Sequence, residues 1–69
     1  MNTSSTDRIK EELAQLQPRI TNLELYLENT VSLQTLNQYD HEDLRNQLNI
    51  MHAYEAVLNR RLRRALSSE

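Results

Sequence analysis

The chain has 69 residues, of which 26% are charged, and a formal net charge of −2. A chain of this length forms one domain at most, near the size at which a single core becomes marginal. It contains no cysteine and no glycine. Disulfides and thiolate metal sites are therefore excluded, and the absence of glycine argues against tight β-hairpins, Walker-type loops and dinucleotide-binding loops. The remaining composition, rich in Leu, Gln, Glu, Arg and Asn, is typical of an all-α protein.

The first residues, M-N-T-S-S-T, are polar and are predicted to form a disordered tail over residues 1–6. Ser5 or Thr6 is the expected cap of a helix that begins near Asp7. The tail lacks the basic-then-apolar order of a secretory signal, and the sequence contains no run of about 18 apolar residues that could span a membrane. We therefore expect a cytoplasmic protein.

A regular apolar pattern follows and predicts the first helix, over about residues 7–28. Its apolar residues are spaced by 4, 3, 4, 3 and 4 positions: Ile9, Leu13, Leu16, Ile20, Leu23 and Leu27. This is the a/d pattern of a helix that packs along a partner in a coiled coil. Pro18 removes one amide donor and clashes with the preceding turn. Because the apolar spacing keeps its phase across Pro18, we expect a kinked helix; the alternative is that Pro18 opens a second helix.

Residues 29–40 lose the helical phase and carry Asn, Thr and Ser. Such residues favour turns and loops, so this segment is predicted to connect two helices. Three apolar residues of the connector are expected to fold back onto the helices: Val31, Leu33 and Leu36.

A second helix is predicted over about residues 41–66, followed by a tail at residues 67–69. Asp40 is its expected N-cap, because Asp is favoured at that position and more acidic residues follow in the first turn. Two helices of this length joined by a short connector make an antiparallel hairpin. The sequence thus predicts one helical-hairpin domain over residues 7–66.

The second helix carries more apolar residues than one partner helix can cover. Its main stripe is expected to face the first helix, while Ile50, Tyr54 and Val57 form another stripe beside it. An exposed apolar band usually marks an interface, so we expect the hairpin to assemble into a homo-oligomeric helical bundle. The predicted oligomer interface includes residues of both stripes: Leu44, Leu48, Ile50, Met51, Tyr54, Val57, Leu58 and Leu62.

The arginines gather at the end of the second helix, in the segment N-R-R-L-R-R at residues 59–64. Cations there complement the negative end of the helix dipole and the last carbonyl groups, which explains part of the cluster. At about 100° per residue, Arg60 and Arg64 point away from Leu62 and are expected to be solvated. Arg61 and Arg63 instead flank the apolar stripe.

An arginine beside an aromatic ring can hold a phosphate next to a stacked base. The predicted ligand site therefore has Arg61 and Arg63 on phosphates and Tyr54 or Tyr39 against a base, although an ordinary interface edge has the same appearance. The acidic balance of the chain argues against binding of duplex nucleic acid.

No catalytic residues, metal site or cofactor is predicted. The two histidines, His41 and His52, lie eleven residues apart on one helix, too far to share a metal ion. The sequence contains no recognisable set of serine, histidine and acid that would form a triad. We therefore expect a binding protein and not an enzyme.

The spacing L-x-x-Q-L-x-x-M-x-x-Y-x-x-x-L-x-x-R, from Leu44 to Arg61, resembles a family of short phage proteins catalogued among crAss-like phages. The run R-I-T-N-L-E-L-Y-L-E and the connector ending in Leu36 match this family too, so the resemblance covers about residues 7–64. Pro18 departs from the uninterrupted first helix of that family.

By shape alone, the hairpin is also similar to the sponges by which phages defeat CBASS and Thoeris immunity, which assemble as oligomers and bind cyclic nucleotides between protomers without cleaving them. The resemblance implies a small phage or prophage accessory protein in the cytoplasm of a bacterial host, which sequesters an anionic cyclic-nucleotide-type signal. The alternative is a protein–protein interaction module that inhibits or adapts a host protein through its apolar helix face.

Overall fold

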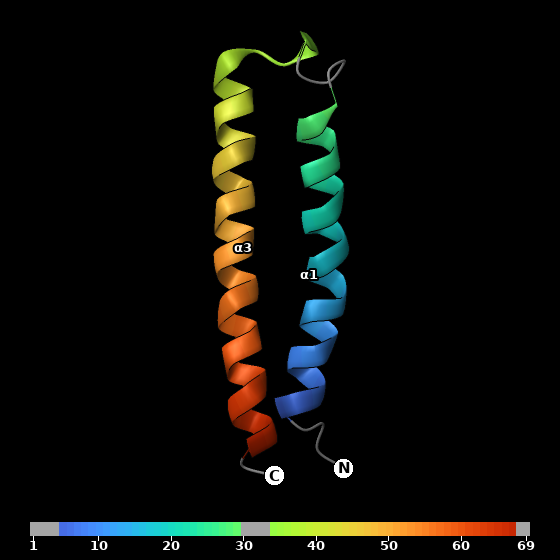
Figure 1. The fold of residues 1–69 in the computed structure, drawn as a ribbon, viewed down its shortest axis with the longest axis vertical. Coiled ribbons are helices and arrows are strands. Elements are labelled where there is room, and N and C mark those ends of the chain that lie inside the picture. Colours follow the sequence, from blue (N-terminus) through green and yellow to red (C-terminus); the bar gives the residue numbers. More distant parts are fainter. Residues whose placement is uncertain (1–4, 30–33, 68–69) are drawn as a thin grey trace.

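The computed structural model describes residues 5–29 and 34–67. Two long helices, α1 (Ser5–Glu28) and α3 (Gln38–Ser67), make up most of this part of the chain. They lie side by side and antiparallel, so that the start of α1 and the end of α3 share one end of the molecule (Figure 1). The predicted all-α helical hairpin is confirmed. It measures 49 × 17 × 15 Å, and neither helix is apolar enough over its length to cross a membrane.

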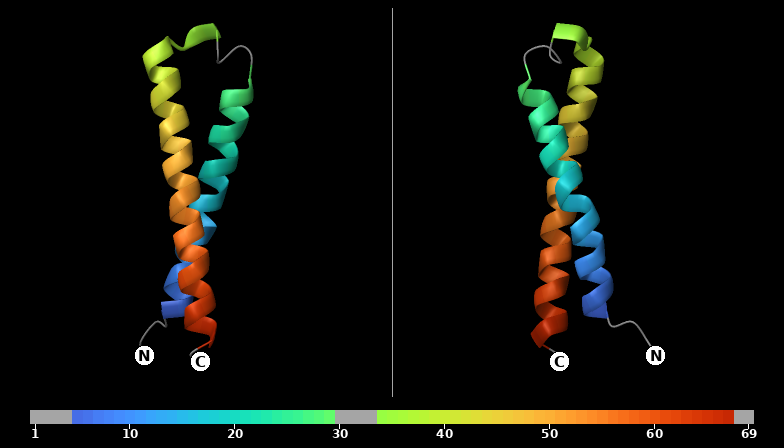
Figure 2. Two further views of the ribbon diagram at one scale, coloured as in Figure 1. Left: turned by 60° about the vertical axis from the view of Figure 1, so that its left-hand side comes forward. Right: turned by 90° about the vertical axis from the view of Figure 1, so that its right-hand side faces the viewer.

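The core lies along the seam between the helices, in the half nearest to the chain ends. Its buried members are four residues of the α1 apolar pattern and one residue of α3: Ile9, Leu13, Leu16, Ile20 and Leu58. Four partly buried residues of α3 pack against them: Leu48, Met51, Leu62 and Ala65. The helices cross and then diverge towards the connector (Figure 2), and accordingly Leu23 and Leu27, at the diverging end, are half-buried.

Both helices begin earlier than predicted. Ser5 and Thr6 belong to α1, and Thr6 is buried. α3 begins at Gln38 because Asn37 is its N-cap: the Asn37 Oδ1 accepts the Asp40 backbone N–H at 2.8 Å, and the Asn37 Nδ2 donates to the Asp40 carboxylate at 3.0 Å. The first of these bonds is the N-cap half of a capping box, and the second holds the Asn37 side chain in place for it. The predicted cap at Asp40 is therefore wrong, and Asp40 instead lies in the first turn.

α1 continues through Pro18 without a break. The alternative in which Pro18 opens a separate helix is therefore wrong. Proline has no amide hydrogen, so one carbonyl of the preceding turn loses its helical donor. One turn further on, the Thr21 hydroxyl donates to the backbone carbonyl of Gln17 at 3.1 Å. The core residues before and after Pro18 remain on one side of the helix, so the apolar phase is kept.

Some predictions about the connector and the tails fall outside the described residues. They concern residues 1–4, Val31, Leu33 and residues 68–69. Leu36, which was predicted to fold back onto the helices, is half-buried. Ser67, which was predicted to begin the tail, is the last residue of α3.

Candidate functional site

One edge of the seam between α1 and α3 is hollowed into a groove, which we call the Tyr54 groove. It consists of two adjoining hollows, of about 320 and 180 Å³, which share Glu12 and Tyr54 in their linings. Its polar lining comes from both helices: Arg8, Glu12, Gln15, Arg19, Gln47, Tyr54 and Arg61. Its apolar lining belongs to the seam: Ile9, Leu16, Met51 and Leu58.

The helical repeat explains why these polar side chains lie on one edge. Those of α1 follow one another at spacings of 4, 3 and 4, which forms one stripe beside the core: Arg8, Glu12, Gln15 and Arg19. Those of α3 are seven residues apart, or about two turns: Gln47, Tyr54 and Arg61. Because the helices are antiparallel, Arg8 shares a hollow with Arg61, whereas Arg19 shares one with Gln47.

The Tyr54 groove is positively charged although the chain as a whole is acidic. Three arginines and one glutamate line it, which gives a formal charge of +2 against −2 for the chain. Arg8 and Arg19 lie eleven residues apart, which is about 16 Å along the helix axis. Guanidinium groups bind phosphate and carboxylate through paired hydrogen bonds. The groove can therefore hold an elongated anion beside a tyrosine ring.

Tyr54 joins the two helices across the middle of the groove. Its hydroxyl donates a hydrogen bond to the Glu12 Oε1 at 3.1 Å. This hydrogen bond raises the pKa of Tyr54, since the ionised phenol cannot donate it; desolvation and the negative charge of Glu12 act in the same direction, while Arg61 opposes them. The bond keeps the hydroxyl of Tyr54 at the α1 side of the groove and so limits where its ring can lie.

The structure brings together two of the four residues predicted to bind a ligand, Arg61 and Tyr54. Arg63 lies on another surface, with Arg60 and apolar residues of the last turns of α3. Tyr39 is 78% exposed near the start of α3. It precedes Arg61 by 22 residues, which corresponds to about 33 Å along the helix. Within one chain, Arg63 and Tyr39 are therefore not part of the Tyr54 groove.

The sequence interpretation missed the residues that α1 contributes to the groove, above all Arg8 and Arg19. Their spacing relative to Glu12 was a usable signal, because it places all three on one edge of a helix. The spacing does not reveal which edge of α3 faces this edge of α1. That pairing depends on the direction in which the connector turns the chain. The place of Arg8 and Arg19 in the site therefore depends on the packing of the two helices, which the sequence of α1 does not determine.

Comparison with known protein families gives a match over most of the chain. The family model described as Sequestin matches residues 4–64. The chain belongs to the Sequestin family. No curated protein and no solved structure gives a match. The family name suggests that its members sequester a ligand and do not convert one.

Membership of the Sequestin family agrees with two expectations from the resemblance, a helical hairpin and a role in sequestering a ligand. The match covers both helices of the hairpin, and sequestration is the activity expected from the likeness to nucleotide sponges. The link to crAss-like phages and the identity of the signal stay predictions. In this Sequestin-family chain, the Tyr54 groove is the candidate place for the sequestered ligand.

The eight residues predicted to form an oligomer interface occupy two surfaces of α3. Five lie along the seam with α1: Leu58 is 1% exposed and the other four are half-buried, namely Leu44, Leu48, Met51 and Leu62. The remaining three are more exposed, with exposed fractions of 68% for Ile50, 41% for Tyr54 and 38% for Val57, and of these Tyr54 lines the groove at one edge of the seam. In the intact hairpin of this Sequestin-family chain, these three are the most exposed residues of the predicted interface.

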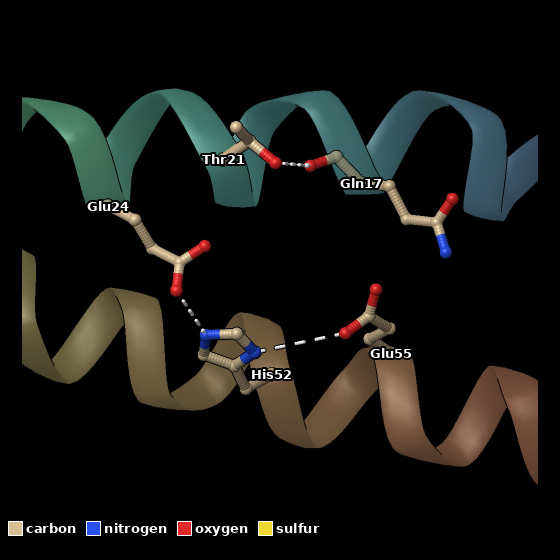
Figure 3. Close-up of polar contacts among 5 residues, drawn as sticks. All are labelled: Gln17, Thr21, Glu24, His52 and Glu55. Atoms are coloured by element: carbon tan, nitrogen blue, oxygen red, sulfur yellow. Dashed lines mark hydrogen bonds and ion pairs between the residues drawn. The ribbon is translucent and has the colours of Figure 1, made fainter.

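The opposite edge of the seam holds His52 between two carboxylates (Figure 3). Its Nε2 lies 3.4 Å from the Glu24 Oε2 of α1, and its Nδ1 lies 3.8 Å from the Glu55 Oε1, one turn further along α3. The His52 and Glu24 side chains are both nearly half exposed, so these pairs contribute little to stability even when His52 is protonated. Among the described residues, no three histidine, cysteine or acidic side chains form a metal-binding group.

Replacing Glu12 with glutamine is expected to lower the pKa of Tyr54 towards its ordinary value of 10.0, because the carboxylate acceptor and its charge are removed. A raised phenol pKa means that folding favours the neutral form. The stability that Tyr54 contributes through this interaction is therefore complete below the pKa of Tyr54 in the unfolded chain. It is lost as pH rises through the pKa of Tyr54 in the folded chain. Carbon-13 NMR of the Tyr54 ring during an alkaline titration measures the change.

The matched control for this titration is Glu11→Gln. Glu11 carries the same charge, is exposed and does not line the groove, so its replacement should leave the Tyr54 titration unchanged. Equal titration curves in both variants would contradict the role of the bond between Glu12 and Tyr54.

Proposed function

We propose that this Sequestin-family chain is a phage or prophage accessory protein that sequesters an anionic cyclic-nucleotide-type immune signal between protomers, in the cytoplasm of a bacterial host and without catalysis. The observation that carries the proposal is the Tyr54 groove. Positive charge in an acidic protein is concentrated there beside an exposed aromatic ring.

The residue types in the groove suit a nucleotide. Arg8, Arg19 and Arg61 offer guanidinium groups for phosphate oxygens. Tyr54 is 41% exposed and in this proposal its ring stacks on a base, an interaction that tolerates any base. The amide groups of the glutamines in the lining can both donate and accept hydrogen bonds, which is what recognition of a base edge requires.

Binding without conversion fits the same lining. A sequestering protein gains nothing from a nucleophile and needs a site that is complementary to the ligand's ground state. The described lining residues are arginine, glutamine, glutamate, tyrosine and apolar side chains, and its carboxylate, Glu12, accepts a hydrogen bond from Tyr54. This composition supports a groove that binds a ligand without converting it.

A site between protomers also allows Arg63 and Tyr39 of a neighbouring protomer to contact the nucleotide. Both are exposed and lie outside the groove of their own chain. A neighbouring protomer is the means by which either could reach a bound nucleotide. In this proposal they supply an additional phosphate contact and an additional stacking ring.

The second candidate function is inhibition or adaptation of a host protein through the apolar helix face. The exposure of Ile50 and Val57 favours it. Salt separates the two functions, because capture of a phosphate by arginine weakens as ionic strength rises, whereas an apolar contact does not.

Native mass spectrometry of the purified chain, alone and with a panel of cyclic dinucleotides, cyclic trinucleotides and ADP-ribose derivatives, tests the proposal. The expected result is an oligomer that carries a stoichiometric adduct of one panel member, intact after release. Calorimetric titration of that nucleotide at low and high salt should then show weaker binding at high salt. An oligomer that stays bare across the panel would overturn the nucleotide proposal and favour the protein target.

A further inference from the structure

An exposed face of α3, which we call the outer face, has a periodicity of its own. Its residues follow at spacings of 3, 4, 3, 4, 3 and 4: Asp43, Asn46, Ile50, Ala53, Val57, Arg60 and Arg64. All of them are exposed, and none belongs to the core along the seam with α1. Alternating steps of three and four are the pattern by which one helix packs along another. The seam accounts for one such stripe of α3, and the outer face is a second.

The outer face is apolar in the middle and oppositely charged at its two ends. Ile50 and Val57 are 68% and 38% exposed, and each lies three and a half positions from the midpoint between Ala53 and Tyr54. Asp43 and Arg64 each lie ten and a half positions from the same midpoint. The apolar pair and the charged pair are therefore symmetric about one point of the helix.

We propose that a second copy of this chain packs antiparallel along the outer face, with a twofold axis at this midpoint. In that arrangement Ile50 of each copy lies opposite Val57 of the other, and Asp43 lies opposite Arg64. A twofold axis requires a surface that complements itself in this way. A parallel pairing would instead place Asp43 against Asp43 and Arg64 against Arg64, and like charges in contact disfavour it.

In this pairing, the arginine-rich end of α3 lies beside acidic residues of the other copy. The first turns of the helix carry Asp40, Glu42 and Asp43, whereas its last turns carry Arg60, Arg61, Arg63 and Arg64. Antiparallel packing places the acidic end of each α3 beside the basic end of the other. The charge complementarity therefore extends beyond the single pair of Asp43 and Arg64.

The same pairing brings the second copy to the border of the Tyr54 groove. Ile50, Tyr54, Val57 and Arg61 follow at spacings of 4, 3 and 4, so they share one edge of α3. Tyr54 and Arg61 also line the groove. A helix packed on the outer face thus forms an extra wall beside each groove. The inference specifies the arrangement of protomers that the proposed function leaves open, and it concerns the chain without any nucleotide.

Charge reversal with compensation tests the pairing. We expect Asp43→Lys alone and Arg64→Glu alone to weaken self-association about tenfold or more, since each places like charges together at two symmetric positions. The variant that carries both changes restores opposite charges across the axis and should associate nearly as well as the original chain. Sedimentation equilibrium over a range of protein concentrations, without nucleotide, gives the dissociation constants.

Two further variants complete the test. Glu11→Lys makes the same change of charge on the exposed side of α1 and should leave association unchanged. Ile50→Asp should abolish association while circular dichroism shows unchanged helix content, because Ile50 lies outside the core. The inference is overturned if the chain is monomeric at every concentration, if Ile50→Asp associates normally, or if the double charge swap fails to restore what the single changes lose. Because no nucleotide is present, these outcomes are independent of whether the groove binds one.

Discussion

Replacing Leu58 with alanine is expected to cost about 2–5 kcal/mol of the free energy of unfolding. Leu58 is 1% exposed and is the one described α3 residue that is fully buried among the α1 core residues. Truncation leaves a cavity that two helices can close only in part. A chain of 69 residues has a total stability of about 3–10 kcal/mol, so this single change removes a large fraction of it. Urea unfolding followed by circular dichroism, at fixed protein concentration, measures the loss.

The matched control is Leu25→Ala. It removes the same atoms from a side chain that is 59% exposed, and a surface change of this kind should alter stability by about 0.5 kcal/mol or less. If the two alanine variants lost equal stability, the seam between α1 and α3 would not be the core of the hairpin.

Replacing Arg61 with alanine is expected to weaken nucleotide binding by about 10- to 100-fold, the effect of losing a hydrogen-bonded charge on a phosphate. Arg61 shares its hollow with Arg8 and lies two turns beyond Tyr54 on the same edge of α3. The Arg61→Lys variant should recover part of the affinity, because lysine keeps the charge but loses the planar fork. Calorimetric titration with the nucleotide identified by mass spectrometry gives the affinities.

The control for Arg61 is Arg45→Ala. Arg45 lies on α3 but lines a hollow on the opposite edge of the seam, with Glu24 and Glu28. Its removal makes the same change of net charge, so it should affect binding only slightly, through long-range electrostatics. A normal affinity in the Arg61→Ala variant would show that the Tyr54 groove is not the binding site.

The core of the hairpin could be predicted because it depends on periodicity alone. The steps of four and three from Ile9 to Ile20 placed one face of α1 inward, and Pro18 did not alter that phase. The start of α3 was less predictable for a local reason. Asn37 and Asp40 are both good capping residues, and they lie three positions apart. The choice between them is made by the hydrogen bonds that Asn37 exchanges with Asp40, which the sequence does not reveal.

The candidate site could be predicted only on the side of α3. Tyr54 and Arg61 could be placed on one edge from the sequence because both lie on one helix, where spacing fixes direction, and they line the same hollow. Arg8 and Arg19 face them from α1, and no local pattern says which edges of two helices meet. Arg63 was predicted to flank the apolar stripe on the side opposite to Arg61, and a separation of two positions on a helix does place the two side chains about 200° apart. Its part in a ligand site therefore depends on a neighbouring chain and stays a prediction.

The elongated shape of the hairpin affects how its assembly must be measured. Its radius of gyration is 15.7 Å, against about 11 Å for a compact domain of the same length. A rod of these proportions meets more friction in solution than a sphere of equal mass, so a single chain passes through a gel-filtration column as if it were a larger globular protein. Packing along α3 thickens the rod and hardly lengthens it, so a pair of chains is closer to spherical than one chain. Its elution volume would therefore differ from that of the monomer by less than a doubling of mass suggests, whereas the mass measured by light scattering would double.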